Sequence, residues 1–118
     1  MLAEPYDSGK RLFGVFSELL ERHFRTERGS GLYAGELGIS MRKLNQLCRG
    51  WYGGKIFEVV LRERLLSEEE FLLLGSDEAI KVISMDLGFF SLQHFRHYFK
   101  KHREVGPLAF RLAGKQEE

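Results

Sequence analysis

The sequence predicts an all-α protein, and three observations support that prediction. Only two prolines, Pro5 and Pro107, occur among 118 residues, so long segments are free to be helical. Apolar residues recur at intervals of three and four along most of these segments, as on one face of an amphipathic helix. Two stretches, fifty-one residues apart, carry the same polar pattern. A chain of this length can bury one ordinary core or two small ones.

Three helices are expected in the first half of the chain. A polar, flexible segment over residues 1–8 precedes apolar positions that repeat at three and four over residues 12–24. A short second helix should end at Gly38, since glycine adopts a left-handed turn at little cost. Ser40 is a favourable N-cap for the third helix. We therefore place a first helix-turn-helix subdomain at residues 9–53.

A long linker helix is expected next, over residues 54–75. No Gly or Pro occurs over residues 55–74, and twenty helical residues would span about 30 Å. The segment from Ser67 to Glu70 would also fit a capping box that starts a new helix. We favour one continuous helix.

The second half of the chain repeats the first. An amphipathic stretch leads to Gly88, and Ser91 is placed to cap the next helix as Ser40 caps its counterpart. Pro107 suits the first turn of a last short helix. These elements form a second helix-turn-helix subdomain at residues 76–113, followed by a flexible tail at residues 114–118.

A small residue precedes each turn by the same distance. Ala34 lies four positions before Gly38, and Ser84 lies four positions before Gly88. The two helices of a helix-turn-helix pack closely enough to favour a small residue at their contact and a glycine in the turn. The repeated pattern therefore supports two copies of this motif.

Each capping serine is followed by polar residues two, five, six and nine positions later. On a helix these offsets fall in one stripe, opposite an apolar face. The side chains are rich in hydrogen-bond donors, the kind that read base edges and phosphates. The pattern predicts two helices that lie on DNA. The stripes are Ser40, Arg42, Asn45, Gln46 and Arg49, and Ser91, Gln93, Arg96, His97 and Lys100.

The distribution of charge supports a polyanionic partner more than the net charge of +1 does. Neither residues 40–55 nor residues 88–103 contain an acid, although both contain several lysines and arginines. Local positive potential is what attracts nucleic acid. Acids gather elsewhere, above all in the run from Glu68 to Glu70, which we expect to be exposed.

Specific roles follow from the chemistry of the side chains. Arginine forks onto guanine, asparagine and glutamine bridge adenine, and an apolar side chain can meet a thymine methyl group. Phosphates suit lysines, arginines and the free amides at a capped helix start. The base-reading candidates are Arg42, Asn45, Gln46, Leu92, Gln93, Arg96 and His97. The phosphate-binding candidates are Ser40, Lys43, Arg49, Ser91, Lys100 and Lys101, which Lys55 and Arg103 could join.

Other reactive groups favour structural roles. Cys48, the only cysteine, lies on the apolar face of its stripe and is expected to be a buried thiol. His94, His97 and His102 lie on one segment but form no helical H-x₃-H pair, so no metal site is expected. No nucleophile, base and orienting group occur in a recognisable arrangement, so we expect neither an enzyme nor a cofactor. Arg64 and Arg111 should pair with acids or carbonyls inside the fold.

The same residues resemble the DNA-binding domain of AraC/XylS-type bacterial transcription regulators. The pattern in the second half of the chain is the more specific of the two. Glu104 departs from it, because the family commonly has glycine at this position. The resemblance covers nearly the whole chain. It rests on Leu37-Gly38-Ile39-Ser40, Leu44, Leu47, Gly53, Arg64-Leu65, Leu87-Gly88-Phe89, Ser91, Phe95, Phe99-Lys100-Lys101, Pro107 and Phe110-Arg111.

The resemblance implies a seven-helix, homeodomain-like fold in which a long central helix joins two helix-turn-helix subdomains. The third and sixth helices would enter successive major-groove segments of double-stranded DNA. It also implies a regulator of bacterial transcription that activates by contacting RNA polymerase. A sensor or dimerisation domain would precede this domain in the parent protein. With no apolar run long enough for a membrane span and no signal sequence, a cytoplasmic, nucleoid-associated protein is expected.

Two alternatives remain open at this stage. The chain could be a helical protein-interaction module that docks an acidic partner without binding DNA, for which the acidic run and the low net charge are the best support. The chain could also be a small complete regulator or a fragment, and its polar start favours a cut at a linker.

Overall fold

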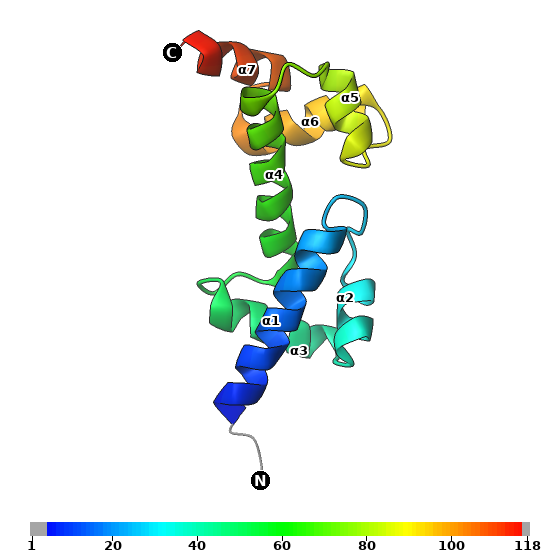
Figure 1. Cartoon of the computed structure of the whole chain (residues 1–118), viewed down its shortest axis with the longest axis vertical. Coiled ribbons are helices and arrows are strands. Elements are labelled where there is room, and N and C mark those ends of the chain that lie inside the picture. Colours follow the sequence, from blue (N-terminus) through cyan, green and yellow to red (C-terminus); the bar gives the residue numbers. More distant parts are fainter. Residues whose placement is uncertain (1–4, 117–118) are drawn as a thin grey trace. The chain divides into compact units, whose positions relative to one another are not determined.

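The computed structural model describes residues 5–116, which form seven α-helices and no strand (Figure 1). The predicted all-α class is confirmed. The first helix begins at Pro5, earlier than expected, and the last continues to Gln116, while residues 1–4 and 117–118 of the two predicted flexible segments lie outside the described residues. The helices are α1 Pro5–His23, α2 Ser30–Leu37, α3 Met41–Trp51, α4 Phe57–Gly75, α5 Ile80–Asp86, α6 Leu92–Arg103 and α7 Pro107–Gln116.

The chain divides into two compact units at a boundary between Arg64 and Leu65. This boundary falls within α4, so each unit includes part of that helix. The helix runs without a break through Ser67, which confirms the continuous helix and not the capping box. At 1.5 Å per residue, α4 is about 28 Å long.

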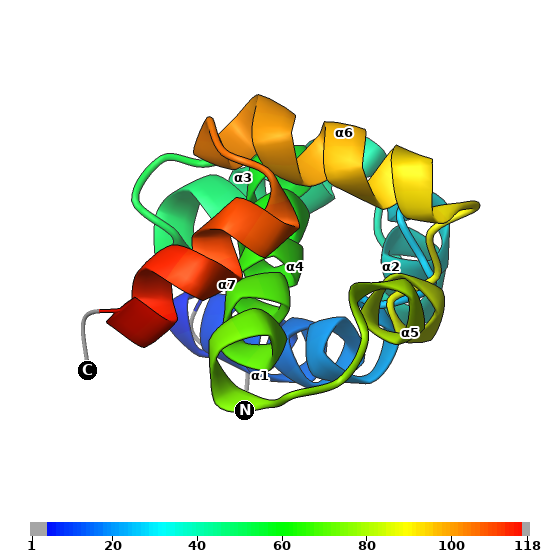
Figure 2. The ribbon, with the colours of Figure 1, turned by 90° about the horizontal axis from the view of Figure 1, so that it is seen from above.

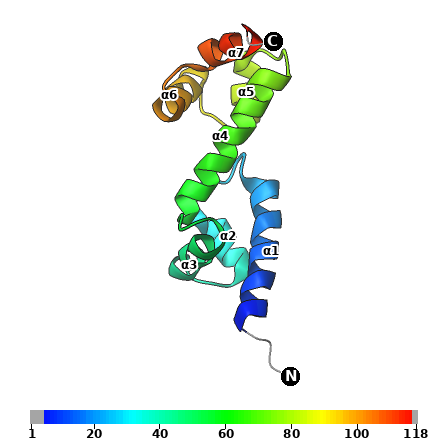
Figure 3. The same ribbon diagram turned by 90° about the vertical axis from the view of Figure 1, so that its left-hand side faces the viewer.

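The first unit has an aromatic core. Helices α1, α2 and α3 contact one another (Figure 3), and the start of α4 adds Phe57. The ring centroids of Tyr33 and Phe57 lie 4.9 Å apart, and both rings pack against Phe16 at about 6 Å. Trp51 stacks on Phe13 at 4.6 Å and therefore packs on the protein. Burial of Phe16, Tyr33 and Phe57 adds apolar stabilisation to the unit.

The second unit has its own core, in which α6 contacts both α5 and α7 (Figure 2). Phe95 and Phe99 of α6 are fully buried, and Phe89 packs against Phe95 at 5.0 Å. Helix α7 also approaches α4 very closely, because a Cβ atom added at Gly114 would lie 2.2 Å from a methyl carbon of Leu74. A larger residue at Gly114 would require the side chain of Leu74, which is 45% exposed, to move aside.

The acidic run on α4 is not exposed, and that prediction is wrong. Glu69 is fully buried, and Glu70 forms an ion pair with Arg103 at 2.9 Å. Three consecutive residues on a helix point in directions about 100° apart, and here the middle one faces the core. The exposed acidic run, one of the two supports for a protein-interaction module that docks an acidic partner, is therefore absent.

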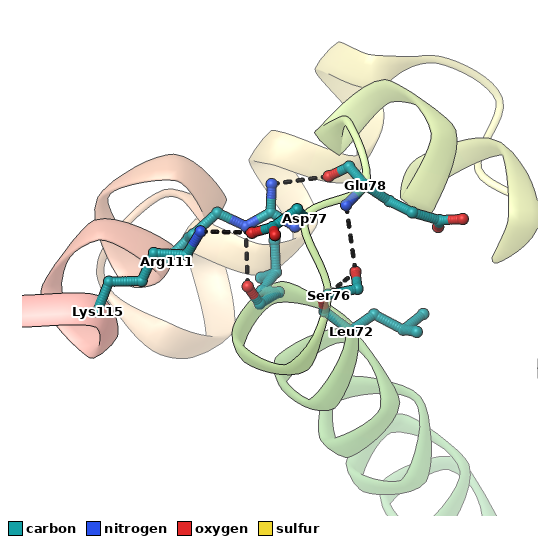
Figure 4. A network of polar contacts seen from close by, with 7 residues as sticks. Leu72, Ser76, Asp77, Glu78, Arg111 and Lys115 are labelled. Carbon is teal, nitrogen blue, oxygen red and sulfur yellow. Dashed lines mark hydrogen bonds and ion pairs between the residues drawn. The ribbon is translucent and has the colours of Figure 1, made fainter. Parts of the chain in front are cut away.

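Arg111 joins α7 to the end of α4 (Figure 4). Its Nε donates to the carbonyl of Leu73 at 2.8 Å, and its Nη1 donates to the carbonyl of Glu78 at 2.7 Å. A second link in the same network is the ion pair between Lys115 and Asp77, at 2.7 Å. Carbonyls at a helix end lack intrahelical partners, so the arginine stabilises both α4 and the segment that follows it.

Candidate nucleic-acid interface

The two predicted turns have the same backbone geometry. Gly38 and Gly88 are left-handed, with φ angles of 66° and 75°. The amide after each glycine donates to the small residue predicted at the helix contact: Ile39 to Ala34 and Phe89 to Ser84, both at 3.0 Å. Both small residues are buried. A left-handed glycine with this bond closes each first helix and turns the chain towards the next.

The second helix of each motif, α3 or α6, is called its outer helix. Each outer helix begins with the predicted serine cap. Ser40 Oγ accepts from the amide of Lys43 at 3.1 Å, and Ser91 Oγ accepts from the amide of His94 at 3.0 Å. The side chain satisfies one of the amides that a helix start leaves without a partner. Both caps are confirmed, and the first turn of each helix carries the positive end of the helix dipole.

Helix α3 has a buried face and a basic outer face. Leu44 and Cys48 are fully buried, and burial raises the pKa of the Cys48 thiol to about 11, as expected for a core thiol. The outer face carries exposed side chains that hydrogen-bond or pair with no other described residue, and we call it the α3 face. Its members are Arg42, Lys43, Gln46 and Arg49.

Asn45 differs from these neighbours. It is half-buried, and its Oδ1 accepts a hydrogen bond of 3.0 Å from the amide of Phe57, the first residue of α4. The periodicity of the stripe placed Asn45 on the outer side of α3, but the structure places it at the edge, against the first turn of α4. Its carbonyl oxygen is therefore already engaged.

Helix α6 repeats the arrangement with different side chains. Phe95 and Phe99 face the core, Leu92 is half-buried near the helix start, and the outer side is basic. We call that outer side the α6 face; its side chains are exposed and pair with no other described residue. Its members are Gln93, Arg96, His97, Lys100 and Lys101.

Several other basic side chains are engaged within the fold. Lys55 pairs with Glu63 at 2.8 Å, and Arg103 pairs with Glu70 at 2.9 Å. Arg64 makes two hydrogen bonds to Glu21, at 2.6 and 2.8 Å. The contrast separates structural cations from those of the α3 and α6 faces, which keep their charge available to a ligand.

Two features beside these faces were not expected. A groove of about 350 Å³ lies between the start of α1 and the α3 face, lined in part by Gly9, Lys43 and Gln46. Phe90, next to the cap Ser91, is 96% exposed. Helical periodicity could not have found either feature, because one depends on the packing of two helices and the other lies in a turn.

Two helix-turn-helix motifs, each with an exposed basic helix, define a DNA-binding domain. A family model described as a helix-turn-helix domain matches residues 33–113, more than half of the chain. The chain belongs to this family, in its AraC type, and is a DNA-binding domain of the kind that regulates transcription. The family is one of DNA-binding domains and not of enzymes.

Solved structures of about 22% identity share the fold. The match to a transcriptional regulator from Chromobacterium violaceum with an AraC-type DNA-binding domain covers 92% of this chain and 96% of the regulator's chain, with a TM-score of 0.76. The DNA-binding domain of AdpA, a global transcriptional factor in complex with a target DNA, covers 91% and 95%, with a TM-score of 0.75. The xylose-binding transcription activator xylR covers 95% of this chain but 28% of its own, with a TM-score of 0.71. No curated protein matches the sequence significantly.

Among the described helices, none has the length and apolar character needed to cross a membrane.

Proposed function

We propose that the chain binds duplex DNA sequence-specifically by placing α3 and α6 in successive major-groove segments. The observation that carries the proposal is the repeated basic face, exposed and unengaged, behind the same turn and the same serine cap. In this proposal residues 9–53 and 76–113 act as the two reading subdomains, and residues 54–75 join them. A helix beginning at the turn is the element that a helix-turn-helix inserts into the groove.

The base contacts are assigned by side-chain chemistry. On α3, Arg42 forks onto guanine O6 and N7, and Gln46 bridges adenine N6 and N7. On α6 the corresponding set is mixed, since an arginine and a glutamine stand beside an imidazole and an apolar side chain. These residues are Leu92, Gln93, Arg96 and His97.

The phosphate contacts flank the base contacts on both helices. Ser40 and Ser91 cap the starts of the two helices, and a helix start with free amides can bind an anion. The charged partners are Lys43, Arg49, Lys100 and Lys101. Each phosphate neutralised contributes about 0.9 to the slope of log affinity against log salt, so binding should weaken steeply with salt.

The relatives suggest a setting for this domain. AdpA was solved with a target DNA, and xylR is a xylose-binding activator of which this fold covers about a quarter. By analogy, we place the domain in a bacterial activator with a sensor or dimerisation domain, acting on nucleoid DNA in the cytoplasm and contacting RNA polymerase. Fold-level likeness is the only support for this setting.

Selection of bound duplexes from a random pool tests the proposal. The expected result is a site with two conserved blocks about one helical turn apart. Arg42→Ala should relax the preference in one block and Arg96→Ala in the other, each by about 1–3 kcal/mol at one base pair. Arg22→Ala, at an exposed arginine of α1 outside both faces, is the matched control. Recovery of no common site, with affinity independent of salt, would refute the proposal.

A further inference from the structure

We infer that Asn45 is a positioning residue that fixes α3 to the first turn of α4, and not a base reader. The inference rests on the proposed function, because it concerns how the α3 face is held for DNA. The single hydrogen bond from the amide of Phe57 to Asn45 Oδ1, at 3.0 Å, joins residues twelve positions apart. It is therefore a tertiary contact between two helices and not a local turn.

The first turn of α4 needs this bond because it has no local cap. Ile56, which precedes the helix, offers only its carbonyl, which accepts from the amides of Val59 and Val60. Its side chain is a hydrocarbon, so it cannot accept from the first amides of the helix as Ser40 does for α3. The amide of Phe57 would otherwise lack a partner. Asn45 supplies the missing acceptor from another helix.

The surroundings make the bond difficult to replace by water. Phe57 is 4% exposed and belongs to the aromatic core with Tyr33 and Phe16. The bond itself is part-buried, so loss of the acceptor would leave the amide of Phe57 without a partner and partly desolvated. The bond should therefore persist in solution and restrain the rotation of α3 about its own axis.

The same bond conflicts with base reading. Bridging adenine requires the amide oxygen to accept from N6 while the amide nitrogen donates to N7. The oxygen of Asn45 already accepts from Phe57, which holds the half-buried carboxamide at the edge of α3 beside α4. To bridge adenine, the same oxygen would have to accept a second bond while turning towards the base, so base reading competes with the bond to α4. Gln46, which is exposed and one position further round the helix, has both of its amide atoms available.

The role of Asn45 is then to set the direction of its neighbours. Arg42 lies three positions earlier on α3 and Gln46 one position later, so a rotation of the helix moves both together. Side chains that read bases must be held within about 0.5 Å of their productive geometry by residues that are themselves locked. The hydrogen bond of Asn45 to Phe57 restrains α3 in this way.

Two substitutions test the inference, with Gln46→Ala as the matched control. Asn45→Ala removes the acceptor, and we expect the melting temperature to fall by about 5 °C, as for loss of a helix cap. Measured well below that temperature on the selected duplex, its affinity should fall about tenfold, while the ranking of single-base variants of the duplex stays the same. Asn45→Asp keeps an acceptor, so it should restore the melting temperature and likewise leave the ranking unchanged. Gln46→Ala should do the reverse, with no thermal effect and a changed preference at one base pair.

Each other outcome overturns the inference. If Asn45→Ala melts like the wild type and alters the ranking at one base pair, Asn45 reads a base. If it melts earlier but binds with unchanged affinity, the bond only stabilises the fold. Failure of the proposed function is distinguishable from both, because the wild-type chain would then select no duplex, whereas the melting temperatures would still report the cap.

Discussion

The two helix-turn-helix motifs share their turns and caps but differ in how the outer helix is held. Helix α3 is tied at its middle, where Asn45 accepts from the first amide of α4. Helix α6 is tied at its end, where Arg103 pairs with Glu70 of α4. A hydrogen bond between neutral groups is insensitive to salt, whereas a half-exposed ion pair is screened by it. The same backbone motif is thus fastened in two physically different ways.

The arginines that brace the two units differ in the same sense. In the first unit, Arg64 binds Glu21 near the surface and lies over the ring of Phe24 at 4.2 Å. In the second unit, Arg111 is buried and binds main-chain carbonyls. Removing a buried cation that satisfies carbonyls leaves groups without partners, whereas removing an exposed one leaves them to water. The second unit should therefore be the more sensitive to loss of its arginine.

The largest effect is expected from Arg111→Ala. It deprives the carbonyls of Leu73 and Glu78 of their donors and should destabilise the second unit by about 3 kcal/mol. Arg64→Ala should destabilise the first unit by about 1 kcal/mol or less, because its ion pair is partly solvated. Amide hydrogen exchange, resolved residue by residue, measures the stability of each unit separately.

Lys81→Ala is the control for these two variants, since Lys81 is exposed on α5 and surface changes of this kind rarely exceed about 0.5 kcal/mol. Equal losses from Arg64→Ala and Arg111→Ala would contradict the difference between the units.

The features that the sequence predicted are local in the chain. The glycine turns, the serine caps and the start of α7 at Pro107 each depend on residues within one helical turn, so the chemistry of a few side chains decides them. The AraC-type resemblance and the all-α fold followed from the repetition of these signals. The structural roles expected for Arg64 and Arg111 also agree with their contacts, although their partners could not be named.

The features that escaped prediction depend on residues distant in sequence. The partner of Asn45 lies twelve positions away in the sequence. A polar stripe indicates the solvent side of a helix, but it does not show which edge of that side another helix covers. The burial of Glu69 depends on how the second unit packs around α4, which the run of three acids in the sequence does not indicate. The base and phosphate contacts stay predictions of side-chain chemistry.

An intermediate effect is expected where the two outer helices end. After α3 the left-handed positions are Gly53 and Gly54, but after α6 the left-handed residue is Glu104, with φ of 70°. A side chain in this region is disfavoured by about 1–2 kcal/mol, partly offset by the freedom that glycine adds to the unfolded chain. Glu104→Gly should therefore stabilise the second unit by about 0.5–1 kcal/mol in urea unfolding.

Gly53→Ala is the converse change, and it should destabilise the first unit by about 1 kcal/mol. A Cβ atom at Gly53 would meet no other atom within 4 Å, so the effect would come from the backbone angle alone. Gly35→Ala has equally open space without a positive φ and should be neutral or stabilising. A destabilised Glu104→Gly variant would show that the carboxylate makes up for the strain.

The smallest effect is the pH dependence of the ion pair that braces the first unit. The hydrogen bonds from Arg64 to Glu21 lower the pKa of that carboxyl below its ordinary value of 4.5. A depressed pKa means that the folded chain binds fewer protons than the unfolded chain, so the stabilisation is complete above pH 4.5 and is lost as the pH falls through the folded pKa. The pair is exposed, so we expect only a few tenths of a kcal/mol. Glu21→Gln should have a lower free energy of unfolding than the wild type at about pH 6, and this difference should shrink as the pH falls to about 3 in urea titrations. A difference that stays constant over that range would place the stabilisation in the Arg64–Phe24 contact instead.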